Sequence, residues 1–512
     1  MKKLVAVLVA FLVAATVVSM VWVTTRPSAS EKAEELEPTG ESAPAGLEKF
    51  YDQQVTWKDC EENLCAQIQV PTNYDKPDGE VTKLSMKRIP ATGGGTGKVL
   101  FVNPGGPGGS AQEYAESFAA STSDKVLATY DIVGVDPRGV GESSPLECLS
   151  DAKFDEFVAT NPAPTTDAGA QELSQGVIAM GKACASNSGE LAGHVSTRDV
   201  ARDQDIVRAA LGQDRFYWFG ASYGTALGAT YADLFPEKVE RMVLDAAVDV
   251  TLDSTQLNLG QAQGFQRALE SYASWCAKSK CALGSTQDEV IDSIQRAVDQ
   301  AAKDPLKGDD GRLLNTGWIF YGLITPLYAE VNWPYMTQAV EGALDGDPTT
   351  LFSLADIYFD REGGTYTTNG GQVIYAVNCL DDGVRGSIDA AKVRDELVPQ
   401  FTKISPLFGE VMAWGAVSCL DWPLPAVTPQ EPVKAAGAKP IVVVGTTRDP
   451  ATPYEWSKNM ASQLESGVLL SRDGDGHTAY QSDNICIDKA IESYLLNGTV
   501  PADGTMCQAN AD

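Results

Sequence analysis

Short apolar runs recur in the first half of the chain, and a turn-rich polar segment follows each of them. Such runs predict strands that are buried on both faces of a sheet. Residues 198–211 have the apolar spacing of a helix that joins two strands, and an antiparallel pair, 66–70 and 81–89, opens the pattern. Alternating strands and helices indicate a mostly parallel sheet with helices on both faces. The predicted parallel strands are Lys98–Val102, Tyr130–Val135, Phe216–Phe219 and Val239–Leu244.

This pattern stops after Val250 and resumes near Lys439. The residues between predict a mainly helical cap, 251–438, inserted between a first core segment, 47–250, and a second one, 439–512. Within the first segment, residues 149–197 are expected to form an irregular excursion. The second segment has predicted strands at 440–445 and 467–470 and a closing helix at 485–496. The helices predicted in the cap are 257–275, 287–302, 318–328, 335–344 and 350–358.

The N-terminus has the form of an export signal. Two lysines follow Met1 and precede an uncharged, mostly apolar run from Leu4 to Thr25. The run is longer than the core of most signal peptides and close to the ~20 residues that span a bilayer. Residues 1–30 are therefore either a cleaved signal peptide or a retained membrane anchor, and residues 31–46 predict a flexible linker. The body is expected outside the cytoplasm, either secreted or held in the cell envelope.

The charge balance argues against one class of partner. The 512 residues carry a formal net charge of -30, and binding to nucleic acid phosphates needs clustered Lys and Arg. The composition, with 43% hydrophobic and 21% charged residues, is that of a globular protein.

Ten cysteines form an even set, and disulfides are the default in an exported chain. Spacing alone does not determine connectivity. Pairing of sequence neighbours is the hypothesis that we carry forward: 60–65, 148–184, 276–281, 379–419 and 486–507. Zinc is a weak alternative, because neither short pair is C-x-x-C and the chain has only two histidines. We expect no metal and no cofactor.

The aromatic run 216–219 leads into the sequence GASYGT at 220–225. A strand, Gly-x-Ser-x-Gly and a helix are the sequence form of a nucleophile elbow, which raises a serine on a tight turn. Glycines on either side allow the backbones to approach closely. By itself the pattern also fits an ordinary glycine-rich turn. The hypothesis that Ser222 is a nucleophile therefore needs the other parts of such a site.

A second glycine-rich loop, NPGGPGGS at 103–110, follows the predicted strand 98–102. Acyl transfer needs N–H donors directed at the developing oxyanion, and a loop after the third strand of an α/β-hydrolase supplies one of them. A merely flexible loop is the alternative. A phosphate-binding loop is disfavoured, because no Gly-Lys-Ser/Thr sequence follows.

A serine nucleophile needs a histidine base and a carboxylate that orients it, in the chain order Ser, Asp, His on this fold. Ser222, Asp449 and His477 occur in that order, and the last two follow predicted strands. His194 precedes the serine, so His477 is the candidate base. Asp475 competes with Asp449, but it lies two residues from His477 and is expected to shape the loop instead.

The loop DPRGVGES at 136–143 follows the predicted strand 130–135. Its Asp and Arg could act in catalysis or could tie loops together beneath the site. We favour the structural interpretation.

The motifs GGPGGS, DPRGVGES, GASYGT, TTRDPATP and DGHTAY together resemble the exported tripeptidyl aminopeptidase branch of the α/β-hydrolases, which is related to prolyl aminopeptidases. They also resemble cell-envelope serine proteases and esterases of mycolic-acid bacteria. The resemblance extends from about Leu47 to the C-terminus. It implies a triad of Ser222, Asp449 and His477.

The same resemblance implies that Gly106, or its neighbour, and Tyr223 donate to the oxyanion. It also implies that acidic cap residues hold a substrate's free amino terminus, for which Asp381 is a candidate. Prolyl aminopeptidases have His where this chain has Pro104, which argues against narrow proline specificity.

The sequence thus predicts an exported serine peptidase that releases short units, such as tripeptides, from free N-termini of peptides. The alternative is a cell-envelope carboxylesterase or lipid esterase. A more remote alternative is a binding protein that has lost catalysis, although no part of the predicted triad is missing.

Overall fold

The computed structural model describes residues 36–93, 96–383, 389–426 and 431–509. In these ranges one sheet has ten strands in the order β1-β2-β3-β5-β4-β6-β7-β12-β13-β14. From β5 to β14 every neighbouring pair is parallel, whereas β1, β2 and β3 add an antiparallel edge. The strands are β1 (Lys58–Cys60), β2 (Asn63–Pro71), β3 (Val81–Ile89), β4 (Lys98–Asn103), β5 (Tyr130–Val135), β6 (Phe216–Ala221), β7 (Val239–Asp245), β12 (Ile441–Arg448), β13 (Gly467–Asp475) and β14 (Thr505–Cys507).

Helices cover both faces of this sheet, which confirms the predicted α/β class. One face packs against α3, α8, α9 and α19, and the other packs against α4, α5 and α20. Strands β5 and β6 are buried along their whole length, because their continuous apolar runs have helices on both sides. The helices are α3 (Glu48–Tyr51), α4 (Ala111–Ser121), α5 (Asp124–Thr129), α8 (Thr197–Ala210), α9 (Tyr223–Leu234), α19 (Tyr454–Gln463) and α20 (Ile485–Asn497).

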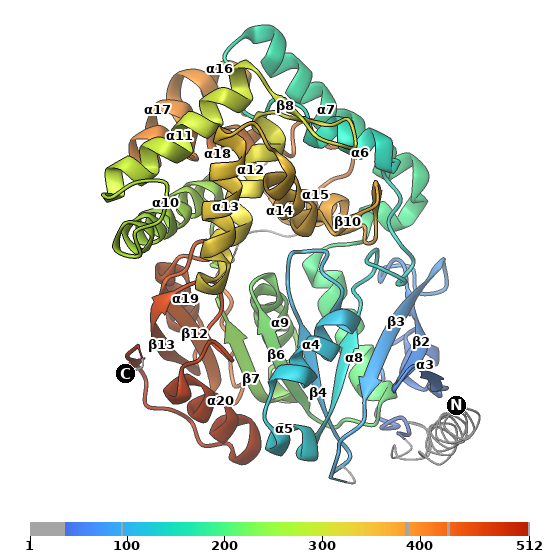
Figure 1. Cartoon of the computed structure of the whole chain (residues 1–512). Coiled ribbons are helices and arrows are strands. Elements are labelled where there is room, and N and C mark those ends of the chain that lie inside the picture. The colour runs from blue at the N-terminus through green and yellow to red at the C-terminus, as the bar shows by residue number, and fades with distance from the viewer. Residues whose placement is uncertain (1–35, 94–95, 384–388, 427–430, 510–512) are drawn as a thin grey trace, which may run out of the picture.

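A second, helical layer lies against one end of the sheet and has its own hydrophobic core (Figure 1). We refer to it as the cap. Small hairpins, β8 (Leu306–Lys307) with β9 (Leu313–Leu314) and β10 (Arg361–Glu362) with β11 (Thr365–Tyr366), connect some of its helices. Its α-helices are α6 (Asp151–Val158), α7 (Asp167–Asn187), α10 (Ser254–Lys278), α11 (Gln287–Lys303), α12 (Thr316–Ile324), α13 (Trp333–Leu344), α14 (Thr349–Phe359), α15 (Gly370–Asp381), α16 (Ala390–Lys392), α17 (Val398–Ile404) and α18 (Gly409–Trp414).

Single helical turns join these elements. The turn η3 lies between α12 and α13 and contacts α10, α13 and α14. The full set is η1 (Gly189–Gly193), η2 (Pro236–Lys238), η3 (Thr325–Tyr328), η4 (Glu330–Asn332), η5 (Val393–Leu397) and η6 (Gly415–Val417).

The expectation of an irregular excursion at 149–197 is wrong. Helices α6 and α7 occupy it and share the core of the cap, where Figure 1 shows them in teal among the later helices. The buried positions of α7 follow helical spacing, but besides Val177 and Met180 they are the small residues Ala170, Gly181 and Cys184. A Cβ at Gly181 would lie 2.7 Å from the Trp422 ring, so this helix packs closely through a glycine. Small residues of this kind give little signal of helical periodicity.

The described part of the predicted linker, residues 36–46, is bound to the core and is not a free tether. Leu36 is buried, and Thr39 donates its amide to the Ala209 carbonyl at 2.9 Å. The Glu41 carboxylate pairs with the buried Arg208 at 2.5 Å and with Lys238 at 2.6 Å. Burial of an arginine requires such a partner, a constraint that linker composition does not reveal. The predicted signal or anchor, residues 1–30, lies outside the described residues.

Five disulfides join the cysteines as sequence neighbours, which confirms the predicted pairing: Cys60–Cys65, Cys148–Cys184, Cys276–Cys281, Cys379–Cys419 and Cys486–Cys507. Such a set is typical of proteins outside the cytoplasm. Among the helices that the structure describes, none has the length and apolar content that a membrane span requires.

Candidate active site

Ser222 stands on a sharp turn between β6 and α9. Its backbone has φ 54° and ψ −125°, a conformation that is strained for a residue with a side chain. A Cβ at Gly220 would lie 2.1 Å from the Gly224 carbonyl oxygen, and one at Gly224 would lie 2.6 Å from the Asn103 carbonyl oxygen. The two glycines of the motif are therefore required for β4, β6 and α9 to meet at this point.

Backbone contacts hold the turn from both sides. The Ser222 amide donates to the Asp245 carbonyl at the end of β7, at 2.9 Å. The Thr225 hydroxyl donates to the Ser222 carbonyl at 2.6 Å and accepts from the Val248 amide at 3.0 Å. The main chain of the serine is thus fixed to the neighbouring strand and to the first turn of α9.

His477 and Asp449 lie side by side in the loops after β13 and β12. The Nδ1 atom of His477 is 2.9 Å from each carboxylate oxygen of Asp449. Asp449 is only 2% exposed, and three donors fix its oxygens: the Ala451 amide at 2.9 Å, the Thr452 amide at 2.8 Å and the Thr452 hydroxyl at 3.0 Å. Because Nδ1 donates to this carboxylate, Nε2 of the neutral ring is left as the acceptor of a proton.

The electrostatics of the pair suit a general base. Burial by itself lowers the pKa of His477, but the charge of Asp449 and its hydrogen bond outweigh burial and raise the pKa above its ordinary value. Asp475 has a different partner, the Arg448 guanidinium at 2.8 Å. It therefore shapes the loop, as expected from the sequence.

These loops meet because β6, β7, β12 and β13 are consecutive parallel neighbours in the sheet. The carboxyl ends of parallel strands lie at the same edge of a sheet, where α/β proteins bind their ligands. Ser222 follows β6, Asp449 follows β12, and His477 follows β13.

The glycine-rich loop after β4 packs directly on the elbow. A Cβ at Gly105 would lie 2.6 Å from the Tyr223 amide nitrogen and 3.0 Å from the Ser222 Cβ. Tyr223 is the first residue of α9, so its N–H has no acceptor within the helix. Gly106, the next residue of the loop, is exposed. The two amides predicted to bind an oxyanion thus belong to two segments in close contact.

The DPRG loop has a structural role, as we favoured. Asp136 accepts hydrogen bonds from Ser110 at 2.9 Å and from the Gln112 side chain at 2.7 Å. Burial raises the pKa of Asp136, and these hydrogen bonds lower it in part. Arg138 is fully buried and pairs with Asp203 on α8 at 2.6 Å.

His194 and Asp381 contact residues of helix α8. His194 lies 3.8 Å from Asp199 and 4.0 Å from Glu190, and neither of these residues belongs to the elbow. Asp381, the candidate acid of the cap, accepts from the Thr197 amide at 3.1 Å and from its hydroxyl at 2.5 Å. The Thr197 hydroxyl in turn lies 2.6 Å from the Tyr223 hydroxyl. Asp381 is thus linked through one threonine to the elbow helix.

Sequence reasoning missed three residues that surround the candidate base. Thr452 lies three residues after Asp449, and its hydroxyl is 3.4 Å from Nδ1 of His477. Tyr328, from η3 of the cap, accepts a hydrogen bond from the His477 amide at 2.8 Å. Asp245 ends β7 and binds the loop beyond His477. A sequence signal existed only for Asp245, which directly follows an apolar run, and for Thr452, which lies in the loop of the candidate Asp449.

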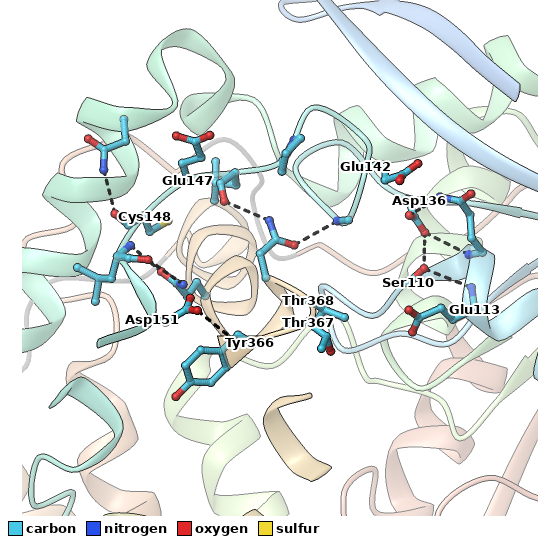
Figure 2. A pocket seen from close by; sticks show the side chains of 18 of the residues that line it. Ser110, Glu113, Asp136, Glu142, Glu147, Cys148, Asp151, Tyr366, Thr367 and Thr368 are labelled. Carbon is cyan, nitrogen blue, oxygen red and sulfur yellow. Dashed lines mark hydrogen bonds between the residues drawn. The ribbon is translucent and has the colours of Figure 1, made fainter. Parts of the chain in front are cut away.

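A cavity of about 820 Å³ opens between the cap and the start of α4 (Figure 2). The walls of the cavity include Ser110 and the β11 residue Tyr366. The glycine-rich loop runs from Gly105 towards this cavity and contacts the cap where Gly108 approaches Gly370. Burial, with the nearby charges of Asp360 and Asp136, raises the pKa of Glu113. The cavity is rich in carboxylates: Glu113, Asp136, Glu142, Glu147 and Asp151.

Chemically, the arrangement offers a serine on a strained turn, a partly buried histidine paired with a buried carboxylate, and the Tyr223 amide next to the serine with a glycine-rich loop packed on it. Within the ranges that the structure describes, no group of three or more His, Cys, Asp or Glu side chains could hold a metal ion. The site as described is suited to acyl transfer by a serine.

A mostly parallel sheet covered on both faces, with a serine elbow after β6, defines an α/β-hydrolase. Consistent with this, the profile described as "alpha/beta hydrolase fold" matches residues 98–287, and the profile described as "TAP-like protein" matches residues 405–507. The chain belongs to the TAP-like, or tripeptidyl aminopeptidase-like, family of α/β-hydrolases.

Named relatives match along most of their length. "Serine protease Hip1" of Mycobacterium tuberculosis (strain ATCC 25618 / H37Rv) is 36% identical over 89% of this chain and 91% of its own. "Carboxylesterase B" of the same strain is 36% identical over 89% of this chain and 90% of its own. "Tripeptidyl aminopeptidase" of Streptomyces lividans is 31% identical over 89% of this chain and 87% of its own.

Proposed function

We propose that this protein is an exported serine peptidase that releases short peptides, chiefly tripeptides, from free N-termini. Ser222 is the nucleophile, His477 the general base, and Asp449 the residue that orients it. The amides of Gly106 and Tyr223 form the oxyanion hole. The observation that carries the proposal is the contact between His477 and the buried Asp449, at the sheet edge where the elbow presents Ser222.

In the proposed reaction the Ser222 Oγ attacks the scissile carbonyl carbon while Nε2 of His477 takes its proton. The C–N bond then breaks, and His477 returns that proton to the leaving amine. Water attacks the acyl ester, His477 takes a proton from the water, and the Ser222 oxygen leaves and regains a proton. Asp449 keeps Nε2 directed at the serine and stabilises the imidazolium form, without itself being protonated.

Two observations support a peptide substrate. The carboxylate-rich cavity beside the cap, whose lining also contains Lys87 and does not include Ser222, Asp449 or His477, suits a positively charged amino terminus, because such a group is attracted to acidic walls. Two of the similar proteins also have peptidase names. The name of the third, carboxylesterase B, supports an esterase of the cell envelope as the second candidate. A non-catalytic binding protein is the remote third.

The proposed organisation has an export signal or membrane anchor at 1–30, core segments at 47–250 and 439–512, and a cap at 251–438. The packing of α6 and α7 with the cap adds residues 151–187 to it. Retention of the N-terminal segment would place the enzyme on the membrane with the body outside. Fractionation of cells that express the full chain, with N-terminal sequencing of the product, tests retention against cleavage.

The test of the function compares tripeptide and tetrapeptide amides, each with a free and with an acetylated N-terminus, and short-chain esters. We expect a peptide product from the free-amine substrates alone. Equal cleavage of the acetylated peptides, with faster hydrolysis of esters, would support the esterase. The Ser222→Ala variant is the control for contaminating activity, and lack of turnover of every substrate by the wild type would favour the binding protein.

A further inference from the structure

Asp245 occupies a central place between the parts of the proposed active site. It ends β7, which lies in the sheet between β6 and β12, and it is paired with Ala221 on one side and Val444 on the other. Ala221 directly precedes Ser222, and β12 leads into Asp449. Asp245 itself is only 1% exposed. A buried carboxylate is costly unless hydrogen bonds satisfy it, so its partners indicate why it is there.

Those partners belong to two of the catalytic loops. The main-chain carbonyl of Asp245 accepts from the Ser222 amide at 2.9 Å. The side-chain carboxylate accepts from the Ala479 amide, at 3.0 Å to each oxygen, and from the Tyr480 amide at 2.8 Å. These two amides lie two and three residues beyond His477. One residue therefore binds the turn of the nucleophile with its backbone and the loop of the base with its side chain.

The loop of the base needs such an anchor. Thr478, between His477 and these amides, has φ 70°, in the left-handed region that a β-branched residue rarely adopts. Its carbonyl accepts a hydrogen bond from the Thr446 hydroxyl at 3.3 Å. The conformation is maintained only if the surroundings hold it, and the Asp245 carboxylate holds the two residues that follow.

We propose that Asp245 is a positioning residue, which sets the separation between Ser222 and His477 by joining their two loops. The proposal rests on the proposed function. It does not make Asp245 a second orienting acid, because Nδ1 of His477 already faces Asp449 at 2.9 Å. Asp245 acts on the main chain beyond the histidine and not on the ring.

The charge of Asp245 adds a measurable signature. Burial raises the pKa of Asp245 to about 6, while the Tyr480 and Ala479 amides and the nearby His477 lower it in part. In return, the charge of Asp245 contributes to the raised pKa of His477, after the larger effect of Asp449. The ionisable groups around Asp245 are His477 and Tyr480 on the loop after β13, Asp449 after β12 and Tyr114 on α4. Loss of the negative charge at position 245 should therefore lower the pKa of the base.

Asp249, four residues further along, provides a matched control. It is 2% exposed and is also a hydrogen-bonded buried carboxylate. Its partners are Thr251, Asn459 and Gln463, none of which is in the elbow or in the loop of the base. Asp249→Asn should therefore lower the stability of the protein, as Asp245→Asn does, but leave kcat and the pH profile unchanged.

The experiment uses the full chain and compares the wild type, Asp245→Asn, Asp245→Glu and Asp249→Asn. It measures the rate of labelling at Ser222 by a fluorophosphonate against pH, kcat and KM on a free-amine tripeptide amide, and the unfolding midpoint. A loop displaced by about 1 Å can cost about 100-fold in rate. For Asp245→Asn we expect kcat and the labelling rate to fall by about this factor, while KM is unchanged. The acid limb of the pH profile of labelling, where the rate falls as His477 is protonated, should move to lower pH.

Asp245→Glu separates position from charge, and it carries the test alone if the Asn variant does not fold. Glutamate keeps the negative charge but displaces the carboxylate oxygens by one methylene. The value of kcat should therefore fall, while the acid limb of the pH profile stays at the pH of the wild type. The proposal is overturned if the Asp245 variants lose only stability, as Asp249→Asn does, with wild-type kcat and pH profile. Failure of the wild type to be labelled at Ser222 would instead refute the proposed function.

Discussion

Tyr328 of the cap contacts His477 of the core twice. Its main-chain carbonyl accepts from the His477 amide at 2.8 Å, and its ring stands edge-on to the imidazole with the ring centroids 5.5 Å apart. A Cβ at Gly476 would lie 3.2 Å from the same carbonyl oxygen. The proposed base is therefore held between the cap and the core, so any displacement of the cap at η3 would reach the imidazole directly.

The first prediction concerns this contact. Tyr328→Ala removes the ring but keeps the main-chain hydrogen bond, so we expect kcat to fall by about 2- to 10-fold, as for the loss of one aromatic pair worth about 0.5–1.5 kcal/mol. Steady-state kinetics on a free-amine tripeptide amide provide the measurement. Tyr335→Ala, at a cap tyrosine that is 54% exposed, should leave kcat unchanged. Equal losses in both variants would contradict a specific role for Tyr328.

Ser222→Ala is expected to lower kcat on the order of 10⁶-fold, because removal of a serine nucleophile disables the triad as a unit. Labelling by a fluorophosphonate should disappear, whereas the circular dichroism spectrum should not change. Mass spectrometry of the labelled wild type should place the adduct on the peptide that contains residue 222. An adduct on another serine would show that the assignment of the nucleophile is wrong.

The two acids near His477 should behave differently. Asp449→Asn leaves the imidazole without the acceptor that sets its tautomer, and we expect a fall in kcat of about 10⁴-fold. Asp475→Asn disturbs only an ion pair with the partly exposed Arg448, which is worth about 0–1 kcal/mol. Its kcat should therefore stay within about 5-fold of the wild type. A larger loss for Asp475→Asn than for Asp449→Asn would reverse the assignment.

Activity should decrease at acid pH with the protonation of His477. The base must be neutral to accept a proton, so kcat/KM rises with pH through the pKa of His477 and is lost below it. Because Asp449 raises this pKa, the midpoint of the acid limb should lie above the ordinary histidine value of about 6.5. An ester substrate is suitable, since the amine of a peptide itself titrates near pH 8. A midpoint below about 6 would contradict the raised pKa.

The glycine-rich loop provides a test of close packing. Gly105 has φ 96°, and a Cβ there would lie 2.6 Å from the Tyr223 amide nitrogen and from the Ala221 carbonyl oxygen. Gly105→Ala should therefore cost about 1–3 kcal/mol in overpacking, besides about 1–2 kcal/mol of backbone strain, and should strongly lower kcat.

The control for this variant is Gly437→Ala. Gly437 has φ 85°, but a Cβ at this position would have no atom of the described residues within 4 Å. Gly437→Ala therefore has the same kind of backbone strain as Gly105→Ala but no close contact of the added Cβ with the described residues. Chemical denaturation gives the stability of each variant, and kinetics give its activity. An active Gly105→Ala protein, with the same stability as Gly437→Ala, would show that the loop does not pack on the elbow.

Much of the sheet was predictable, because each of its buried strands is a local apolar run. Phe216–Ala221 and Tyr130–Val135 are examples, with every residue buried. The docking of residues 36–46 was not predictable, because it depends on the burial of Arg208, whose partner Glu41 lies 167 residues away. Helix α7 was missed because most of its buried positions, such as Ala170 and Gly181, are small residues, and these carry little hydrophobic signal.

The sequence by itself determined the candidate Ser222, Asp449 and His477, because each stands in a short motif next to a strand and the chain has only two histidines. Only the tertiary structure decided which groups hold them in place. Asp245 and Ala479 are 234 residues apart in the chain yet share a hydrogen bond, and Tyr328 comes from a different layer than His477. A local pattern determines which strand or turn forms, but contacts of this range exist only once the sheet has brought the ends of its strands together.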